Sequence, residues 1–304
     1  MANNINLATK YTPELDKMIV QEAKTGFFAD NVFKAKFTGA KTVMIPEINF
    51  DGLGDYDRAE GYSKGDTNLT HVSYTLTKER SKQLILDAQD ADESGVPDLV
   101  GKMVGEYTRT KVNPEIDAFA LSKLAGIAAS TEDDKVNNTK TYAQATAVAD
   151  MLATINNVEA SNGYGNEELV AFVDPVMYGI LMTSTELQRF ITISDFKQGE
   201  IDMKVKKLNG CVIIPVSSER MYNIFKFKDK GFAPATAEDG EAAKPIRALV
   251  LPKKSASLIK KVDKVNVLSP DQVEDMDAYK INYRLYYDLI VTKSRINTIH
   301  AIIG

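Results

Sequence analysis

The sequence has no tryptophan, a single cysteine and two histidines among its 304 residues. One cysteine, Cys211, excludes an internal disulfide and a cluster of thiolate zinc ligands, and its apolar surroundings predict an inert buried thiol. The histidines, His71 and His300, belong to no metal or hydrolase motif, because HExxH, CxxC and G-x-S-x-G are all absent. These absences predict a protein that is not an enzyme.

Long hydrophobic runs are also missing. No apolar window of 18 residues occurs, which argues against a membrane-spanning helix. Residues 1–10 are rich in asparagine and lack the basic and apolar segments of a secretory signal. We therefore expect no interaction with a membrane.

Motifs that hold cofactors or metals are incomplete. Gly101-Lys102 is followed by Met103 and lacks the earlier glycine of a phosphate-binding loop, and two Gly-x-Gly turns, at 52–54 and 163–165, lack the third glycine of a dinucleotide fingerprint. A calcium loop would need a glutamate where Gly101 stands, although its opening is matched by Asp90, Asp92, Ser94 and Gly95. We predict no catalytic residue, no cofactor and no bound metal.

The charge balance is mildly acidic. The chain has 37 Lys and Arg against 42 Asp and Glu, a net charge of -5, and a pI near 5.3. This balance argues against a protein that holds nucleic acid by neutralising phosphates.

A hydrophobic content of 44% is ordinary for a globular chain, and 304 residues form one large domain or two moderate ones.

A long helix organises the chain. Between Asp92 and Ser130, apolar residues recur every three or four positions, which is the stripe of an amphipathic helix. We expect the helix to span about 94–130, with Ser94 as N-cap and Pro97 in the first turn.

Pro114 interrupts this helical pattern. It removes one backbone donor and crowds the carbonyl of Thr110. The element is therefore either one helix kinked near Thr110 or two helices with Asn113 capping the second.

Residues 49–68 separate two alternating segments, 37–48 and 70–76, that are typical of strands. The intervening residues include four glycines and several acids, which cannot pack a core of their own. We predict a long hairpin with a projecting tip, and such a tip usually finds its contacts on another molecule.

The stretch 279–291 has the clearest strand pattern in the chain. Period-two geometry places its odd positions on one face, and they are Tyr279, Ile281, Tyr283, Leu285, Tyr287, Leu289 and Val291. The natural partner of this face is the stripe of the long helix, which predicts an α+β layer. The residues between the two halves then form an α/β domain of their own, at 141–261.

Local signals divide this inserted domain into elements. Residues 142–158 have helical periodicity, and 169–173 form an apolar strand. Asp174 is a candidate cap for a helix that begins at Pro175.

Turn signals complete the chain. Asn209-Gly210 lies between two strand-like runs and is the strongest short hairpin signal available. Residues 226–244 are typical of an exposed loop, and 246–251 of a buried strand. Residues 1–36 predict an arm followed by a short helix capped by Thr12.

Several stretches along the chain are distinctive when taken in order. They are Phe37–Pro46 leading into the hairpin, the long helix with Pro114–Ala118 and Ser122–Ala125, the strand and turn of Val170–Leu181, the run Leu208–Val216 with Arg220-Met221, and the strand Arg284–Val291. In this order they resemble the HK97-like major capsid proteins of tailed phages. The resemblance covers nearly the whole chain and depends on the order of the stretches.

The resemblance implies an α+β, HK97-like capsid fold. It places an N-terminal arm at 1–36, an extended E-loop hairpin at 37–87, a discontinuous P domain with the spine helix at 88–140 and 262–304, and an inserted α/β A domain at 141–261. A fused, cleavable scaffolding domain is not visible.

A protein of this family is a structural major capsid protein that assembles through pentamers and hexamers into an icosahedral shell around the phage genome. The expected partners are other copies of the chain, a portal and scaffolding proteins. The enclosed double-stranded DNA would be held without sequence-specific binding. The expected location is the capsid of the virion, after assembly in the host cytoplasm.

The same reasoning predicts two sets of subunit contacts. Those at the E-loop tip are Gly52, Gly54, Asp55, Tyr56, Asp57, Arg58, Tyr62 and Lys64. Those in the P domain are Arg109, Arg284 and Asp288.

Three alternatives stay open. An encapsulin-type nanocompartment would share the fold and enclose cargo enzymes. A phage tail-tube subunit would assemble into cylinders. An unrecognised hydrolase would need a buried cluster of ionisable groups, against which the two histidines and the missing nucleophile motif argue.

Overall fold

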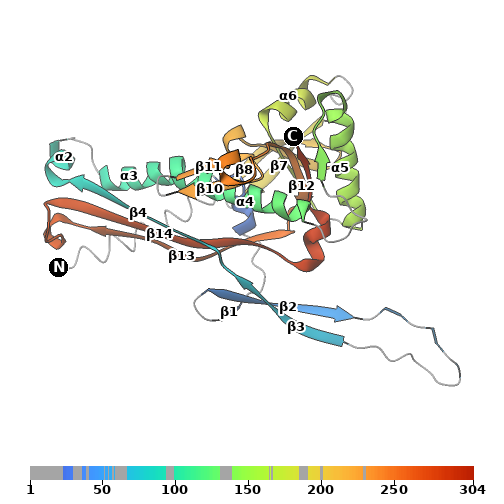
Figure 1. Ribbon diagram of the computed structural model, residues 1–304, viewed down its shortest axis with the longest axis horizontal. Helices are drawn as coiled ribbons and strands as arrows, with labels where there is room; N and C mark the ends of the chain where they lie inside the picture. The colour runs from blue at the N-terminus through green and yellow to red at the C-terminus, as the bar shows by residue number, and fades with distance from the viewer. Residues whose placement is uncertain are drawn as a thin grey trace.

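The computed structural model describes residues 23–29, 36–38, 41–50, 52–53, 55–56, 58, 67–93, 99–130, 139–163, 165, 167–184, 191–198, 201–228 and 231–304. These residues form an elongated α+β body from which one hairpin extends (Figure 1). The predicted N-terminal helix capped by Thr12, and the predicted cap at Ser94 with Pro97, lie outside the described residues.

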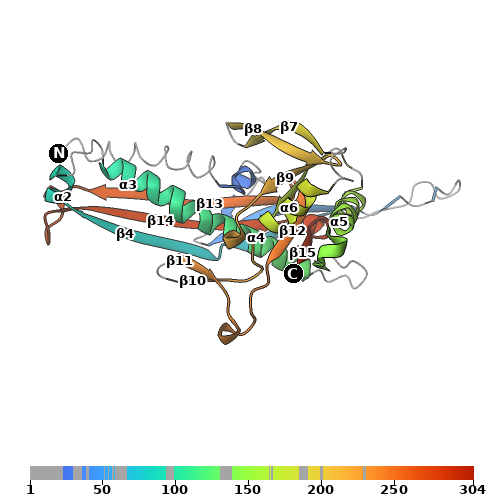
Figure 2. The ribbon, with the colours of Figure 1, turned by 90° about the horizontal axis from the view of Figure 1, so that it is seen from above.

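The long helix is continuous over 31 residues. It consists of α3 (Leu99–Tyr107), a π-helical turn η2 (Thr108–Val112) and α4 (Asn113–Ala129). At 1.5 Å per residue this rod is about 45 Å long. The helix runs along the body, and its C-terminal end lies beside a sheet of seven strands that is described below (Figures 1 and 2).

The π turn accommodates Pro114. Proline cannot donate to the carbonyl four residues earlier, and the backbone N–H of Asn113 bonds the carbonyl of Thr108, five residues earlier, so the helix widens here. Of the two predicted alternatives, the single helix is therefore correct, with a π turn at 108–112 where a kink near Thr110 was expected, and the alternative in which Asn113 caps a second helix is wrong. The Asn113 side chain is buried and has no hydrogen-bond partner among the described residues.

A three-stranded antiparallel sheet, here called the long sheet, packs against this helix. Its strands are, in order, β13 (Ala256–Leu268), β14 (Ala278–Val291) and β4 (Lys78–Asp87). Ring centroids of Tyr107 and Tyr283 are 6.0 Å apart, and those of Phe119 and Tyr287 are 5.3 Å apart. The predicted packing of the odd face of β14 on the long helix is confirmed, and each buried tyrosine contributes roughly 2 kcal/mol or more.

The opposite face of β14 is also buried toward its C-terminal end. Tyr286 and Ile290 pack with Val43, Ile45 and Leu76 in a separate small core. Alternation alone did not indicate this second core, because it forms only where another part of the chain crosses the sheet.

The projecting hairpin leaves the body at this small core. It consists of β2 (Thr42–Phe50) and β3 (Thr67–Thr75), with the short β1 (Lys36–Thr38) beside β2. The predicted hairpin is confirmed, but its predicted limit at residue 87 is too late. Residues 78–87 are β4, and all of its ladder partners lie on β14.

A seven-stranded mixed sheet forms the other part of the body. Its order is β5 (Thr139–Thr141), β15 (His300–Ile303), β12 (Ile246–Pro252), β6 (Leu169–Val173), β9 (Cys211–Pro215), β8 (Ile201–Leu208) and β7 (Ile191–Gln198). The last strand of the chain thus joins this sheet and not the long sheet. Residues 262–304, which the sequence predicts to lie in one domain with the long helix, are therefore divided between the two sheets, although both parts contact that helix.

Helices cover both faces of the central strands of the seven-stranded sheet. The helices α5 (Ala147–Ser161) and α6 (Pro175–Thr183) pack on one face through Met151, Ile155 and Leu181, among others. The helix α4 and the 3-10 turn η1 (Gly26–Ala29) pack on the other face, where Phe27 and Phe28 are fully buried. Alternate residues of β6 therefore enter two different cores.

Most local predictions in this region are confirmed. The carboxylate of Asp174 accepts a 2.8 Å hydrogen bond from the N–H of Met177 and caps α6. Asn209 and Gly210 both have positive φ, 48° and 79°, in the turn between β8 and β9. The loop predicted at 226–244 is wrong in part, because β10 (Phe225–Lys228) and β11 (Gly231–Pro234) pair as a hairpin.

The remaining short elements connect these layers. They are α2 (Ala88–Glu93), η3 (Gln144–Thr146), η4 (Ser218–Arg220), η5 (Ala237–Asp239), η6 (Pro270–Gln272) and η7 (Lys293–Thr298).

Candidate subunit interface

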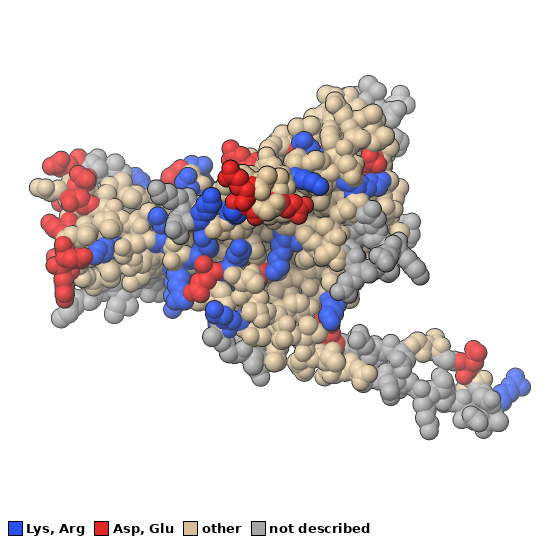
Figure 3. Space-filling model, viewed as in Figure 1, with Lys and Arg blue, Asp and Glu red and all other residues tan. Residues whose placement is uncertain are grey.

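Charged side chains are unevenly distributed over the surface. On the face shown in Figure 3, Asp and Glu gather at the end of the body that carries α2 and again near its middle, where most of the Lys and Arg of this face also lie. We call the first region the acidic end. Its exposed carboxylates come from α2, η6 and the adjoining residues, and are those of Asp87, Asp90, Asp92, Glu93, Asp271, Glu274, Asp275 and Asp277.

The tip of the projecting hairpin presents apolar side chains to solvent. Leu53 is fully exposed, and Tyr56 and Leu69 are 62% and 59% exposed. A concentration of exposed apolar groups on a projecting element is typical of a surface that another molecule covers. Of the predicted tip contacts, Gly52, Asp55, Tyr56 and Arg58 are described and exposed, while Gly54, Asp57, Tyr62 and Lys64 lie outside the described residues.

A buried carboxylate anchors the base of this hairpin. Asp288 is 1% exposed and accepts hydrogen bonds of 2.9 Å from both the N–H and the hydroxyl of Thr77, which lies between β3 and β4. Its other oxygen accepts from the N–H of Leu289 and forms an ion pair with Lys123 of α4. Asp288, which we predicted at a subunit contact, is instead an internal anchor, because its four donors belong to its own subunit.

A second buried carboxylate attaches the N-terminal segment to the long helix. Asp117 of α4 is fully buried and accepts from the N–H and the hydroxyl of Thr25 at 3.0 and 2.7 Å. The Lys24 N–H and the Arg220 guanidinium complete its shell. The sequence analysis did not predict this site. The available signal was Asp117 itself, an acid among the apolar positions of the predicted helix.

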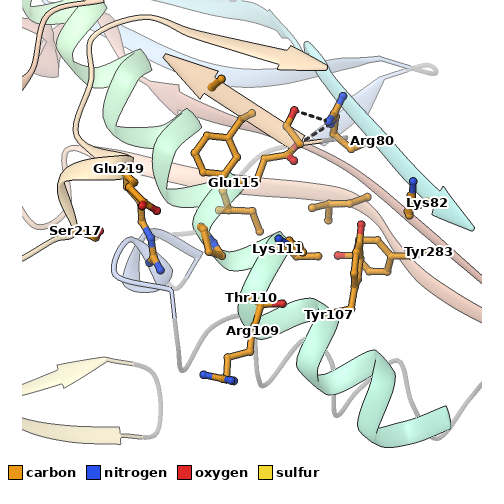
Figure 4. A pocket seen from close by; sticks show the side chains of 18 of the residues that line it. Arg80, Lys82, Tyr107, Arg109, Thr110, Lys111, Glu115, Ser217, Glu219 and Tyr283 are labelled. Atoms are coloured by element: carbon orange, nitrogen blue, oxygen red, sulfur yellow. Dashed lines mark hydrogen bonds and ion pairs between the residues drawn. The ribbon is translucent and has the colours of Figure 1, made fainter. Parts of the chain in front are cut away.

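A cleft of about 970 Å³ opens between the long helix and the strands beside it (Figure 4). Its walls are residues 107–116 of the helix, parts of β4 and β14, and the segments 217–222 and 231–234. Tyr107, Tyr222, Phe232 and Tyr283 supply aromatic surface. The cleft therefore combines apolar walls with several charged groups.

Cations outnumber carboxylates in the cleft. Arg80 donates to Glu115 at 2.6 Å and to the carbonyl of Lys228 at 2.7 Å. Burial, followed by the neighbouring charge of Arg80, lowers the pKa of the nearby Lys78. Burial, followed by Glu115, raises the pKa of the Tyr107 hydroxyl, which stays a neutral donor at physiological pH.

The other two predicted contacts of this region are exposed arginines. Arg109, on the π turn at the margin of the cleft, pairs with Glu106 one turn earlier, with N–O distances of 3.1 and 2.6 Å. Arg284 of β14 pairs with Glu79 of β4. Both ion pairs are well exposed to solvent, so each contributes little to stability, and both cations are accessible to a neighbouring molecule.

The described residues contain no group of three His, Cys, Asp or Glu side chains placed to hold a metal ion. Burial lowers the pKa of the His300 imidazole and raises that of the Cys211 thiol, so both are neutral. Among the described helices, none is long and apolar enough to cross a membrane.

No family model and no curated protein matches the sequence. Solved structures do match across most of the chain. The cyanophage P-SCSP1u capsid matches with a TM-score of 0.60 at 15% identity, over 88% of this chain and 84% of that chain. The mature capsid of bacteriophage PhiM1 matches with a TM-score of 0.58 at 14% identity, over 87% and 82%.

A virus-like particle from Pyrococcus furiosus also matches, with a TM-score of 0.51 at 9% identity, over 97% of this chain and 99% of that chain. The fold is therefore that of the shell-forming chains of viral particles. It is the HK97-like fold of tailed-phage capsids, as the order of sequence stretches predicts.

Proposed function

We propose that this chain is the major capsid protein of a tailed phage. It assembles through pentamers and hexamers into an icosahedral shell that encloses the phage genome, and it has a structural role without catalysis. The observation that carries the proposal is the likeness of fold over more than four fifths of both chains to subunits of two phage capsids.

The elements take the following places in this proposal. The projecting hairpin is the E-loop, the long helix with the long sheet is the P domain, and the seven-stranded sheet with α5 and α6 is the A domain. The exposed Leu53 and Tyr56 support contact between the hairpin and a neighbouring subunit, since such side chains are stabilised when covered. Gly52, Asp55 and Arg58 belong to the same contact.

Self-association is the activity that these surfaces serve. Contacts between unlike surfaces of identical subunits close into rings, and rings of five and six join into an icosahedral shell. A portal and a scaffolding protein are further partners in this proposal. The enclosed DNA is confined without sequence-specific contacts, which a chain of net charge -5 favours.

Electron microscopy of the purified protein, combined with sedimentation velocity, tests the proposal. We expect closed shells, or free pentamers and hexamers that convert to shells when the protein is concentrated. A compact monomer at every concentration, even with the other virion components added, would overturn it.

A cellular nanocompartment is the second candidate. It would share the fold, and the match to a virus-like particle from a cellular organism, Pyrococcus furiosus, over 97% and 99% of the two chains, is the reason to test it. The contents of the particles distinguish the two functions. Packaged double-stranded DNA supports a phage capsid, whereas protein cargo without DNA supports a nanocompartment.

A further inference from the structure

The cleft beside the long helix has more positive charge than its own carboxylates neutralise. Five cations line it. Arg80, Arg109 and Arg220 form ion pairs with Glu115, Glu106 and Asp117, and Glu219 is the other carboxylate of the lining. Lys82 of β4 and Lys111 of the π turn are exposed and have no ion pair among the described residues. A cavity with unpaired cations in its lining favours an acidic occupant.

The aromatic walls favour an occupant that is also partly apolar. Aromatic side chains around a concave site are typical anchors of protein interfaces, and a polar rim around them is the usual arrangement. The cleft has both features in Tyr107, Tyr283 and the lysines Lys82 and Lys111.

The acidic end has the complementary composition. Ile85 and Met276 are 52% and 39% exposed there, among the exposed carboxylates. The N–H of Ala88 donates to the carbonyl of Asp277 at 3.1 Å, so α2 and the start of β14 form one continuous surface. Among the described residues, only one carboxylate of the acidic end forms an ion pair, which joins Asp275 to Lys280 at 2.7 Å.

The two surfaces lie apart on one body, with the acidic end at its extremity and the cations across its middle (Figure 3). Contact between them therefore needs two copies in a head-to-tail arrangement. Such heterologous contacts generate rings when the rotation closes. We propose that the cleft receives the acidic end of a second copy of this chain, an inference that rests on the proposed capsid function and identifies two of its contact surfaces.

Paired charge reversals test this proposal. Lys82→Glu with Lys111→Glu reverses the cleft, and Glu93→Lys with Glu274→Lys reverses the acidic end. All four side chains are exposed, so the isolated subunits should fold as the wild type does. Each pair of substitutions should raise the subunit concentration required for assembly about tenfold or more, because like charges then face each other.

Restoration of assembly is the decisive measurement. A chain with all four substitutions restores opposite charges and should assemble near the wild-type concentration. Assembly is followed by light scattering, and particles are identified by electron microscopy.

Lys254→Glu and Glu241→Lys serve as matched controls. Both residues are exposed, and they lie outside the cleft and the acidic end. These variants should assemble as the wild type does, which distinguishes the proposed contact from the effect of a charge reversal elsewhere on the surface.

Two results would overturn the inference while leaving the capsid function intact: normal assembly of both reversed chains, or no recovery in the chain with four substitutions. If the reversed cleft assembles normally but the unassembled subunits lose binding to a double-stranded DNA fragment, the occupant is nucleic acid and the inference is wrong. Failure of the wild type to form shells at all would instead contradict the proposed function.

Discussion

Removing the carboxylate of Asp288 should destabilise the subunit strongly. The Asp288→Ala variant leaves the N–H and hydroxyl of Thr77 without their acceptor and Lys123 without its counter-ion. Arg284→Ala provides a matched control on the same strand, because its ion pair with Glu79 is exposed on both sides.

The structure sets the expected magnitude. Breaking a buried ion pair by removing one partner costs about 3–5 kcal/mol. Lys123 is 33% exposed and regains some hydration, so we expect a loss of about 3 kcal/mol for Asp288→Ala. The exposed pair of Arg284 should contribute at most about 1 kcal/mol.

Urea unfolding of unassembled subunits, followed by circular dichroism, measures both losses. With a slope of about 3 kcal/mol per molar urea, the Asp288→Ala midpoint should fall by about 1 M and the Arg284→Ala midpoint by about 0.3 M or less. Thr77→Val, which keeps the carboxylate and loses one hydroxyl, should lie between them. Equal midpoints for Asp288→Ala and Arg284→Ala would refute the reasoning that Asp288 is the anchor.

Three further predictions concern pH, the hairpin and the long sheet. The folded state holds His300 neutral with its pKa below the ordinary 6.5, so the unfolded chain binds more protons as pH falls through 6.5 and stability should decrease. Urea midpoints at pH 7.5 and 5.5 should show a smaller difference in His300→Leu, and an undiminished difference would contradict this. Replacing residues 52–66 by Asn-Gly should leave the melting temperature of isolated subunits nearly unchanged while blocking assembly, and a subunit that fails to fold would disprove it. Tyr283→Asp places a carboxylate on the buried face of β14 and should cost several kcal/mol in urea unfolding, whereas tolerance would mean that the faces of β14 are reversed.

Most of the correct predictions concern features that depend on residues close together in the sequence. The period of the apolar residues is a local property, and it identified the long helix and the buried face of β14. Capping by Asp174 and the turn at Asn209-Gly210 depend on hydrogen bonds and dihedral angles within a few residues, so the sequence alone indicated them.

The features that the sequence did not predict depend on contacts between residues far apart in the chain. The partner of Asp288 is Thr77, 211 residues away, and Asp117 holds Thr25 across 92 residues. In its local sequence each of these acids looks like an ordinary polar residue. Only the fold buries its carboxylate and brings hydrogen-bond donors to it. The assignment of Asp288 to a subunit contact failed for this reason.

The sequence by itself determined where the long helix forms and which face of β14 packs on it, because periodicity and turn chemistry act over a few residues. Only the tertiary structure decided that residues 300–303 join the seven-stranded sheet, that residues 78–87 belong to the long sheet, and that a cationic cleft lies beside the π turn. The physical reason is that strand partners and cavity walls come from segments far apart in the chain. Which strands pair depends on the apolar surface that the whole fold buries, and no single segment determines it.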